Sequence, residues 1–202
     1  MKHRNIDFTC GSVIKNLILF SIPIILGELL QNLYNSVDAL VVGNFVSENA
    51  LAAVNVCSVL CAMLINFFNG MSFGANVVVS RKFGERDVPG MHRAIKATFS
   101  FAVILGVILS AAGIIATPGL LKLAGVQPEY HTEALTYMRV YLIGLMFTVI
   151  YNNGAGILRA LGDSDSPFRI LVVTCSVNIV LDLCFVVLLK LEVLGVALAT
   201  IL

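Results

Sequence analysis

Long apolar runs separated by short polar segments dominate this chain of 202 residues. A helix needs roughly 20 mainly apolar residues to cross the hydrocarbon core of a bilayer. Five runs are long enough, at about residues 17–43, 51–79, 94–117, 134–158 and 168–190. A sixth covers residues 193–202 and is incomplete, so we expect the chain to be part of a longer protein. The pattern predicts an all-α membrane protein with a transmembrane region over residues 17–202.

The segments between the runs carry residues typical of turns. They are residues 47–49 (SEN), 83–90 (FGERDVPG) and 162–167 (GDSDSP). Residues 1–16 are predicted as a cytoplasmic N-terminus with a short interfacial helix from Cys10. The first run lacks a small-residue cleavage site and is too long for a signal peptide, so we interpret it as a retained span.

The composition supports a membrane location. Hydrophobic residues make up 58% of the chain and charged residues only 12%, whereas a soluble domain is nearer one half and one quarter. One globular core could not cover this apolar surface, so the lipid bilayer is the expected partner. The net charge of +1 gives no sign of a nucleic-acid partner.

The basic residues predict the orientation of the spans. If the N-terminus is cytoplasmic, the outer side holds Lys122, Arg139 and Lys190. The other ten Lys and Arg residues lie on the inner side: Lys2, Arg4, Lys15, Arg81, Lys82, Arg86, Arg93, Lys96, Arg159 and Arg169. Cytoplasmic loops carry the excess of Lys and Arg. We therefore predict a multi-pass protein of the cell (inner or plasma) membrane with a cytoplasmic N-terminus.

Three acids, Glu28, Asp38 and Asp182, fall inside the runs. A mid-bilayer Asp costs roughly 2.5–3.5 kcal/mol unless it faces a cavity or a partner. Asp38 lies five residues before Gly43 and Asp182 eight before Lys190, hence about 8 and 12 Å from the outer ends of spans that run in the same direction. If these two spans are neighbours, both carboxylates can face one cavity. Glu28 is offset from the face of Asp38 and is a candidate second proton site or substrate contact.

Other polar groups share the faces of the two aspartates. One or two turns before Asp38 on its face lie Gln31, Tyr34 and Asn35. Asn178 precedes Asp182 by one turn. Amide and carboxylate oxygens suit a hard cation such as Na⁺, with Asp38 and Asp182 as its metal ligands. Two nearby acids in a low dielectric equally suit a shared proton.

Four amides and one proline also interrupt the apolar runs. Interhelical hydrogen bonds are the expected role of such amides, here Asn66, Asn69, Asn152 and Asn153. Pro23 removes a backbone donor inside the first span, so we expect a kink there.

Two of the five cysteines, Cys57 and Cys61, lie one helical turn apart. This spacing could hold a metal, but no His or acid accompanies the pair in sequence. Packing by a small apolar residue is the favoured interpretation.

An ordered set of short motifs runs through nearly the whole chain. The motifs are Pro23, residues 31–38 (QNLYNSVD), 42–43 (VG), 51–54 (LAAV), 70–74 (GMSFG), 80–87 (SRKFGERD), 158–163 (LRALGD), Pro167, 178–182 (NIVLD) and 195–200 (GVALAT). The set resembles the first part of multidrug and toxic compound extrusion (MATE) transporters, and the two aspartates resemble the DinF-type branch.

The resemblance implies the N-terminal six-helix lobe of a twelve-span MATE-like fold, with five full spans and a truncated sixth. It implies a secondary active antiporter that extrudes small organic cations or drugs in exchange for H⁺ or Na⁺, with no other cofactor. A cation site of Asp38, Asn178, Asp182 and Thr200 would follow, with Asn153 as a weaker member. The missing C-terminal lobe would supply the other half of the substrate cleft.

Two other functions stay open. A lipid-linked oligosaccharide flippase of the same superfamily would line its cleft with more cationic groups, and here only Arg139 lies near a span end. A membrane enzyme acting on prenyl diphosphates could hold Mg²⁺ with Asp163 and Asp165. The residues around them read as a turn with helix-capping groups, so we expect no enzyme activity.

Overall fold

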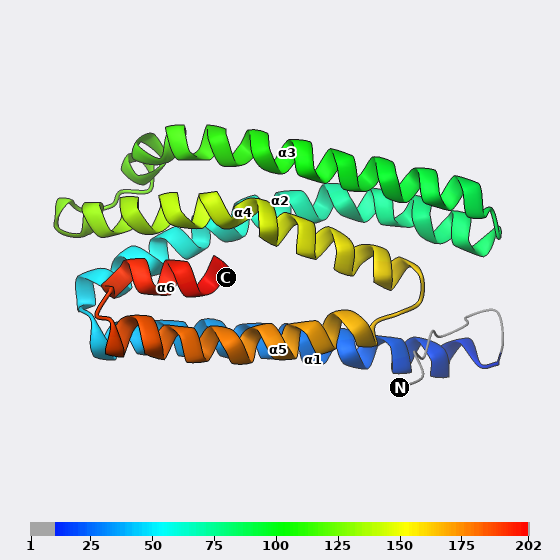
Figure 1. Ribbon diagram of the computed structural model, residues 1–202, viewed down its shortest axis with the longest axis horizontal. Helices are drawn as coiled ribbons and strands as arrows, with labels where there is room; N and C mark the ends of the chain where they lie inside the picture. The colour runs from blue at the N-terminus through cyan, green and yellow to red at the C-terminus, as the bar shows by residue number, and fades with distance from the viewer. Residues whose placement is uncertain (1–10, 202) are drawn as a thin grey trace.

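The computed structural model describes residues 11–201 as a bundle of long helices (Figure 1). In chain order they are α1 (Val13–Phe45), α2 (Glu48–Gly84), α3 (Val88–Leu123), the 3₁₀ turn η1 (Pro128–Tyr130), α4 (His131–Ala160), α5 (Asp165–Asp182), the π-helix η2 (Leu183–Leu188) and α6 (Glu192–Ile201). The first four predicted runs each lie within one of these helices. The fifth lies in α5 and η2 apart from its last two residues, and the described part of the sixth lies in α6. The all-α prediction is confirmed, and the described residues contain no strand.

The helix predicted at the start of the chain is not separate from the first span. Residues 13–16, expected in a separate interfacial helix, are the first turn of α1. Cys10, where that helix was expected to begin, lies outside the described residues. The helices α2 and α3 also extend well beyond their apolar runs, because polar residues continue them where a helix leaves the hydrocarbon.

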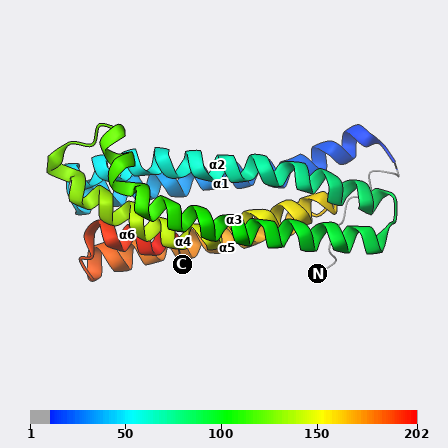
Figure 2. The same cartoon turned by 90° about the horizontal axis from the view of Figure 1, so that it is seen from above.

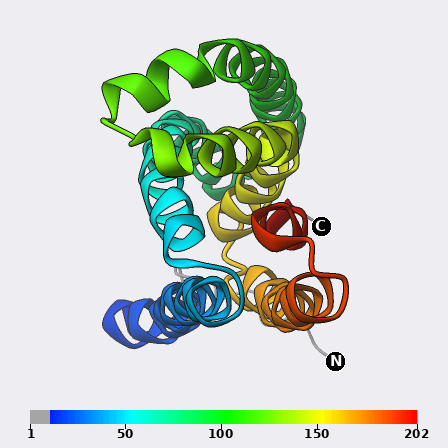
Figure 3. The same ribbon diagram turned by 90° about the vertical axis from the view of Figure 1, so that its left-hand side faces the viewer.

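The helices form two groups, which Figure 3 shows from one end of the bundle. In one group α1 packs against α5, and in the other α2, α3 and α4 pack against one another. The short helix α6 packs mainly on α4 and returns along η2 and α5. The first and fifth spans are therefore neighbours, which the shared site proposed from the sequence requires.

Local residue chemistry accounts for the helix ends. The Ser47 hydroxyl accepts a hydrogen bond from the Ala50 N–H at 3.0 Å and caps α2. Asp87 does the same for α3, accepting from the Gly90 N–H at 2.9 Å. Gly162, with φ of +86°, follows α4 in the left-handed region that favours glycine and lets the chain turn into α5.

Pro23 lies inside α1, which continues through it as one helix of 33 residues. Figure 2 shows the first turns of α1, in dark blue, inclined to the rest of the helix. A bend here follows from the missing proline N–H and from the pressure of the ring on the preceding turn.

Large apolar side chains cover much of the outer surface. Ile14 is 72% exposed and Ile115 81% exposed. Of the helices in the described part of the chain, five are long and apolar enough to cross a membrane. In α1 only 6% of the most apolar window is buried inside the bundle, so lipid or another part of a larger protein must cover the rest.

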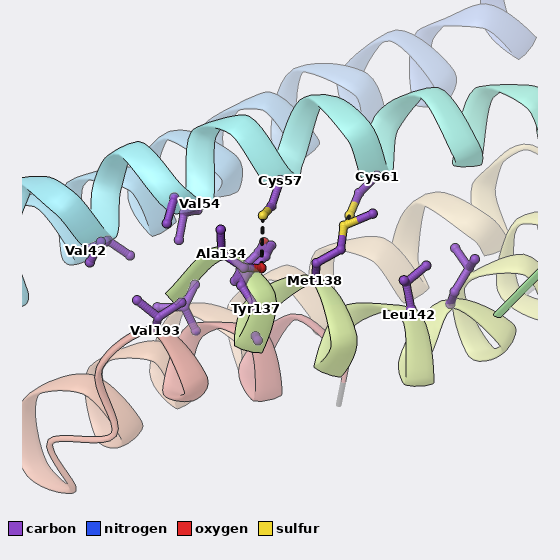
Figure 4. Packing of buried hydrophobic residues seen from close by; sticks show 14 of the residues in the cluster. Val42, Val54, Cys57, Cys61, Ala134, Tyr137, Met138, Leu142 and Val193 are labelled. Carbon is purple, nitrogen blue, oxygen red and sulfur yellow. Dashed lines mark hydrogen bonds between the residues drawn. The ribbon is translucent and has the colours of Figure 1, made fainter. Parts of the chain in front are cut away.

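The buried core lies mainly between α2, α4 and α6 (Figure 4). Its fully buried side chains include Val42, Met138, Leu142 and Val196. This core fixes α4 against α2, and the looser space between α2 and α1 is left for a cavity.

Candidate functional site

Two carboxylates, Asp38 of α1 and Asp182 at the last residue of α5, meet inside the bundle. Asp38 is 7% exposed and Asp182 is fully buried. Their carboxyl groups lie close enough to interact with each other. The helices α1 and α5 run side by side in the same direction. Two acids at similar distances from the ends of these helices therefore lie near each other.

This acid pair is short of hydrogen-bond donors. Within residues 11–201, Oδ1 of Asp38 and both carboxylate oxygens of Asp182 are buried without a hydrogen-bond partner. Two ionised carboxylates can only accept, so contact between them satisfies neither. A cation between the two groups, either a proton or a metal ion, would supply what they lack.

Asn178 extends the same pocket of unsatisfied groups. It lies one turn before Asp182 on α5 and is 8% exposed. Both its Oδ1 and its Nδ2 are buried and lack a partner among the described residues. Buried polar groups normally find partners, and several orphaned ones together indicate a site that a ligand completes.

The pair borders a large cavity of ≈ 1580 Å³ between α1 and α5 on one side and α2 and α4 on the other. Asp38 and Thr200 are part of its wall, whereas Asn178 and Asp182 are not among its lining residues. The Thr200 hydroxyl donates to the Val196 carbonyl at 2.9 Å, which leaves its oxygen lone pairs available. Asp38 is therefore the member of the acid pair that faces the cavity.

The polar stripe of α1 faces the same cavity. Gln31, Tyr34 and Asn35 all line it, as the face they share with Asp38 predicts. Glu28 also lines it and is exposed, so its offset from Asp38 does not remove it from the cavity wall.

A second polar wall on α2 was missed. It consists of four amides: Asn55, Asn66, Asn69 and Asn76. We expected Asn66 and Asn69 to hydrogen-bond between helices, but both are exposed on the cavity. Their spacings of 11, 3 and 7 residues place all four on one helix face, and this signal was present in the sequence.

Aromatic rings add to the wall. Tyr137 and Tyr141 of α4 stack with ring centroids 6.1 Å apart and both line the cavity, as does Tyr151. The cavity wall therefore combines aromatic faces, amides and two acids, a lining able to hold an organic cation.

Two arginines lie on the cavity wall, and neither was expected there. Arg86 follows α2 and Arg159 lies near the end of α4, at the same end of the bundle (Figure 1). The sequence showed only Arg139 as a cationic group near a span end, but Arg139 is exposed and is not part of the wall. Arg139 and Arg159 both belong to α4 but lie on different faces of it, which span boundaries alone do not reveal.

Asn153 lies apart from the acid pair. It is fully buried, and its Nδ2 donates to the Thr98 carbonyl of α3 at 3.2 Å. Its neighbour Asn152 lines the cavity. Asn153 therefore belongs to the contact between α3 and α4, on a different face of α4 from the one that lines the cavity.

The segment proposed as a magnesium site is a turn. Asp163 accepts hydrogen bonds from the Ser166 N–H at 3.0 Å and the Ser166 hydroxyl at 2.6 Å. Asp165 lies 3.9 Å from Arg169, one turn along α5. In the part of the chain that the structure describes, no three His, Cys, Asp or Glu side chains gather into a metal site.

Comparison with known proteins adds a family to this geometry. A model of the MatE family matches residues 23–184. A probable multidrug resistance protein of Bacillus subtilis, YpnP, is 34% identical over 97% of this chain and 44% of its own length. The multidrug export protein MepA of Staphylococcus saprophyticus is 24% identical over 96% of this chain and 43% of its own length.

Solved structures give the same result. A multidrug resistance MATE family transporter in its outward-facing conformation superposes with a TM-score of 0.91 at 30% identity. The match covers all of this chain and 44% of that one. This chain thus spans less than half the length of the relatives it matches.

Proposed function

The chain belongs to the MatE family, and from this premise we propose that it is the N-terminal lobe of a secondary antiporter. The antiporter would export small organic cations or drugs in exchange for H⁺ or Na⁺. Relatives named as multidrug resistance and multidrug export proteins support the substrate class. A C-terminal lobe would be the missing partner, because the relatives are more than twice as long as the matched region.

The acid pair carries this proposal. Asp38 and Asp182 leave three buried carboxylate oxygens without a donor among the described residues, and Asn178 adds another oxygen. An empty pair of this kind is unstable in a low dielectric, whereas a pair holding a proton or Na⁺ is partly neutralised. The coupling cation would therefore bind here.

Coupling follows from the position of Asp38 between two environments. Its carboxyl group contacts Asp182 on one side and belongs to the cavity wall on the other. When the cation leaves, the negative charge would attract a cationic substrate into the cavity. When the cation returns, that attraction would fall and the packing of α1 against α5 would change, so substrate is released.

The protein would lie in the cell membrane with a cytoplasmic N-terminus. The distribution of basic residues supports this orientation. Arg86 and Arg159 would then mark the cytoplasmic end of the cavity, and the acid pair its outer end.

Drug efflux by the full-length protein tests the proposal. Cells lacking their own exporters would express the wild type, Asp38→Asn or Asp182→Asn, and efflux of a fluorescent cationic dye would be measured. Both substitutions keep the side-chain shape and remove the titratable charge. We expect each to lower the efflux rate at least tenfold at equal amounts of folded protein.

Glu129→Gln is the matched control, because Glu129 lies in η1, away from the cavity wall. It should leave efflux unchanged. Wild-type efflux by Asp38→Asn would remove the acid pair from the mechanism.

A flippase of the same superfamily remains the second candidate. Arg86 and Arg159 on the cavity wall are the cationic groups that this function needs. Glu28 and Asp38 on the same wall oppose it, because they would repel a diphosphate. Transfer of a lipid-linked oligosaccharide across vesicles, with no dye efflux, would favour the flippase.

A further inference from the structure

Three sulfur atoms gather between α2 and α4, near the cavity but outside the acid pair. The Cys61 thiol donates to Sδ of Met138 at a sulfur–sulfur distance of 3.6 Å. One turn earlier, the Cys57 thiol donates to the Ala134 carbonyl at 3.3 Å. Figure 4 shows Cys57 and Cys61 pointing from α2 toward α4, where Met138 lies opposite Cys61.

We infer that Cys61 and Met138, with Cys57 beside them, form a binding site for a soft monovalent metal ion such as Cu⁺. Thiolate and thioether sulfur are the ligands that Cu⁺ prefers. Ions that prefer oxygen, such as Mg²⁺ and Ca²⁺, gain little from such ligands. The sulfur site and the acid pair should therefore bind different classes of cation.

The charges balance in this site. Binding breaks the S–H bond of Cys61, releases its proton to solvent and forms a bond between the thiolate and Cu⁺. Met138 adds a neutral thioether, so the complex of one thiolate and one Cu⁺ carries no net charge. A neutral complex avoids the large cost of burying an ion in a low dielectric.

The geometry needs little rearrangement. Metal–thiolate bonds are about 2.3 Å long in the best-known case of zinc. Two sulfur atoms 3.6 Å apart can therefore share one ion at a bent angle. A wider angle between the two sulfur–copper bonds would require the Met138 side chain to move, and this flexible side chain adapts more easily than a branched one.

An ion can reach the site from the cavity. Cys61 is part of the cavity wall although its side chain is almost fully buried. Ser58 and Tyr137 line the wall beside it. Met138 and Cys57 are buried behind this entrance, so the site would hold the ion away from water.

The test is transfer of copper to the purified full-length protein in detergent. Cu⁺ would be supplied as its coloured complex with bathocuproine disulfonate under anaerobic, reducing conditions. Loss of colour reports copper taken by the protein. We expect the wild type to take one Cu⁺ per chain, and Cys61→Ser and Met138→Leu each to weaken binding at least tenfold.

Cys184→Ser is the matched control, since Cys184 lies on η2, away from the sulfur cluster, and should leave binding unchanged. Met138→Leu keeps side-chain volume and is expected to fold, so it decides the question if Cys61→Ser does not fold. The inference is overturned if the wild type takes no copper from the chelator. It is equally overturned if Met138→Leu binds copper as tightly as the wild type does.

Discussion

The two adjacent amides of α4 allow stability and transport to be separated. Asn153 donates from Nδ2 to the Thr98 carbonyl at 3.2 Å, and its Oδ1 is buried without a partner among the described residues. Asn152 lines the cavity and is only half-buried. Replacing each with alanine removes the same amide group, once from the α3–α4 contact and once from the cavity wall.

The size of the Asn153→Ala effect follows from its one hydrogen bond. Interhelical hydrogen bonds in membrane proteins contribute about 0.6 kcal/mol on average and at most about 1.7 kcal/mol. Loss of buried packing adds to this, while removal of the orphaned oxygen offsets part of it. We therefore expect the free energy of unfolding to fall by about 1 kcal/mol, with efflux per folded molecule unchanged.

Asn152→Ala should behave in the opposite way. Its removal leaves the α3–α4 contact intact, so the free energy of unfolding should stay within about 0.5 kcal/mol of the wild type. Its loss from the cavity wall should alter the dye concentration that gives half-maximal efflux.

Unfolding by sodium dodecyl sulfate in mixed micelles measures the stability of both variants of the full-length protein. Dye efflux, normalised to the folded protein that elutes as a single species, measures transport. The reasoning is refuted if Asn153→Ala abolishes efflux at unchanged stability. That result would return Asn153 to the cation site that the family resemblance implies.

Three further predictions concern other parts of the fold. Leu142→Ala, in the fully buried core, should lower the free energy of unfolding by about 2–5 kcal/mol in the same micelle assay. Lys190→Gly should raise the free energy of unfolding by about 0.5–1 kcal/mol, because Lys190 has a φ of 53°, in the left-handed region that favours glycine. Lys122→Gly, in the last turn of α3, should lower the free energy of unfolding. The hydrogen bond from the Gly90 N–H, and to a smaller extent the one from Lys82, lowers the pKa of Asp87 below its ordinary 3.8. The α3 cap is thus complete above the unfolded-state pKa and is lost as the pH falls through the lower folded one. An NMR titration of the Gly90 amide should have its midpoint below pH 3.8, and a midpoint above it would contradict the cap.

Much of the fold could be predicted because lipid imposes a simple constraint. A run of about 20 apolar residues has few stable alternatives to a spanning helix. Helix ends were less predictable, since α2 and α3 continue into polar residues that water can solvate. The π-helix η2 directly after Asp182, which packs against α5 and α6, had no clear sequence signal.

The candidate site was predictable where one helix carried all the information. The stripe from Gln31 to Asp38 follows from helical periodicity and lines the cavity. The role of Asn153 could not be predicted in this way. Asn152 and Asn153 are adjacent but face different neighbours, and only the packing of α4 decides which of them faces the cavity. Arg86 was missed because it lies in the turn after α2. Arg159 was missed because the sequence did not show which face of α4 lines the cavity.

Infrared difference spectroscopy on the full-length protein tests the central claim most directly, namely that a cation bound at Asp38 and Asp182 is exchanged for substrate. Spectra would be recorded as a cationic drug is added to the wild type, Asp38→Asn and Asp182→Asn. The account predicts a change in the carboxyl or carboxylate bands of the wild type that is absent from both variants. Loss of a protonated carboxyl band would identify H⁺ as the exchanged cation, and a drug-induced carboxylate change that requires Na⁺ would identify Na⁺. An unchanged wild-type spectrum on drug binding, or the same change in both variants, would contradict the account.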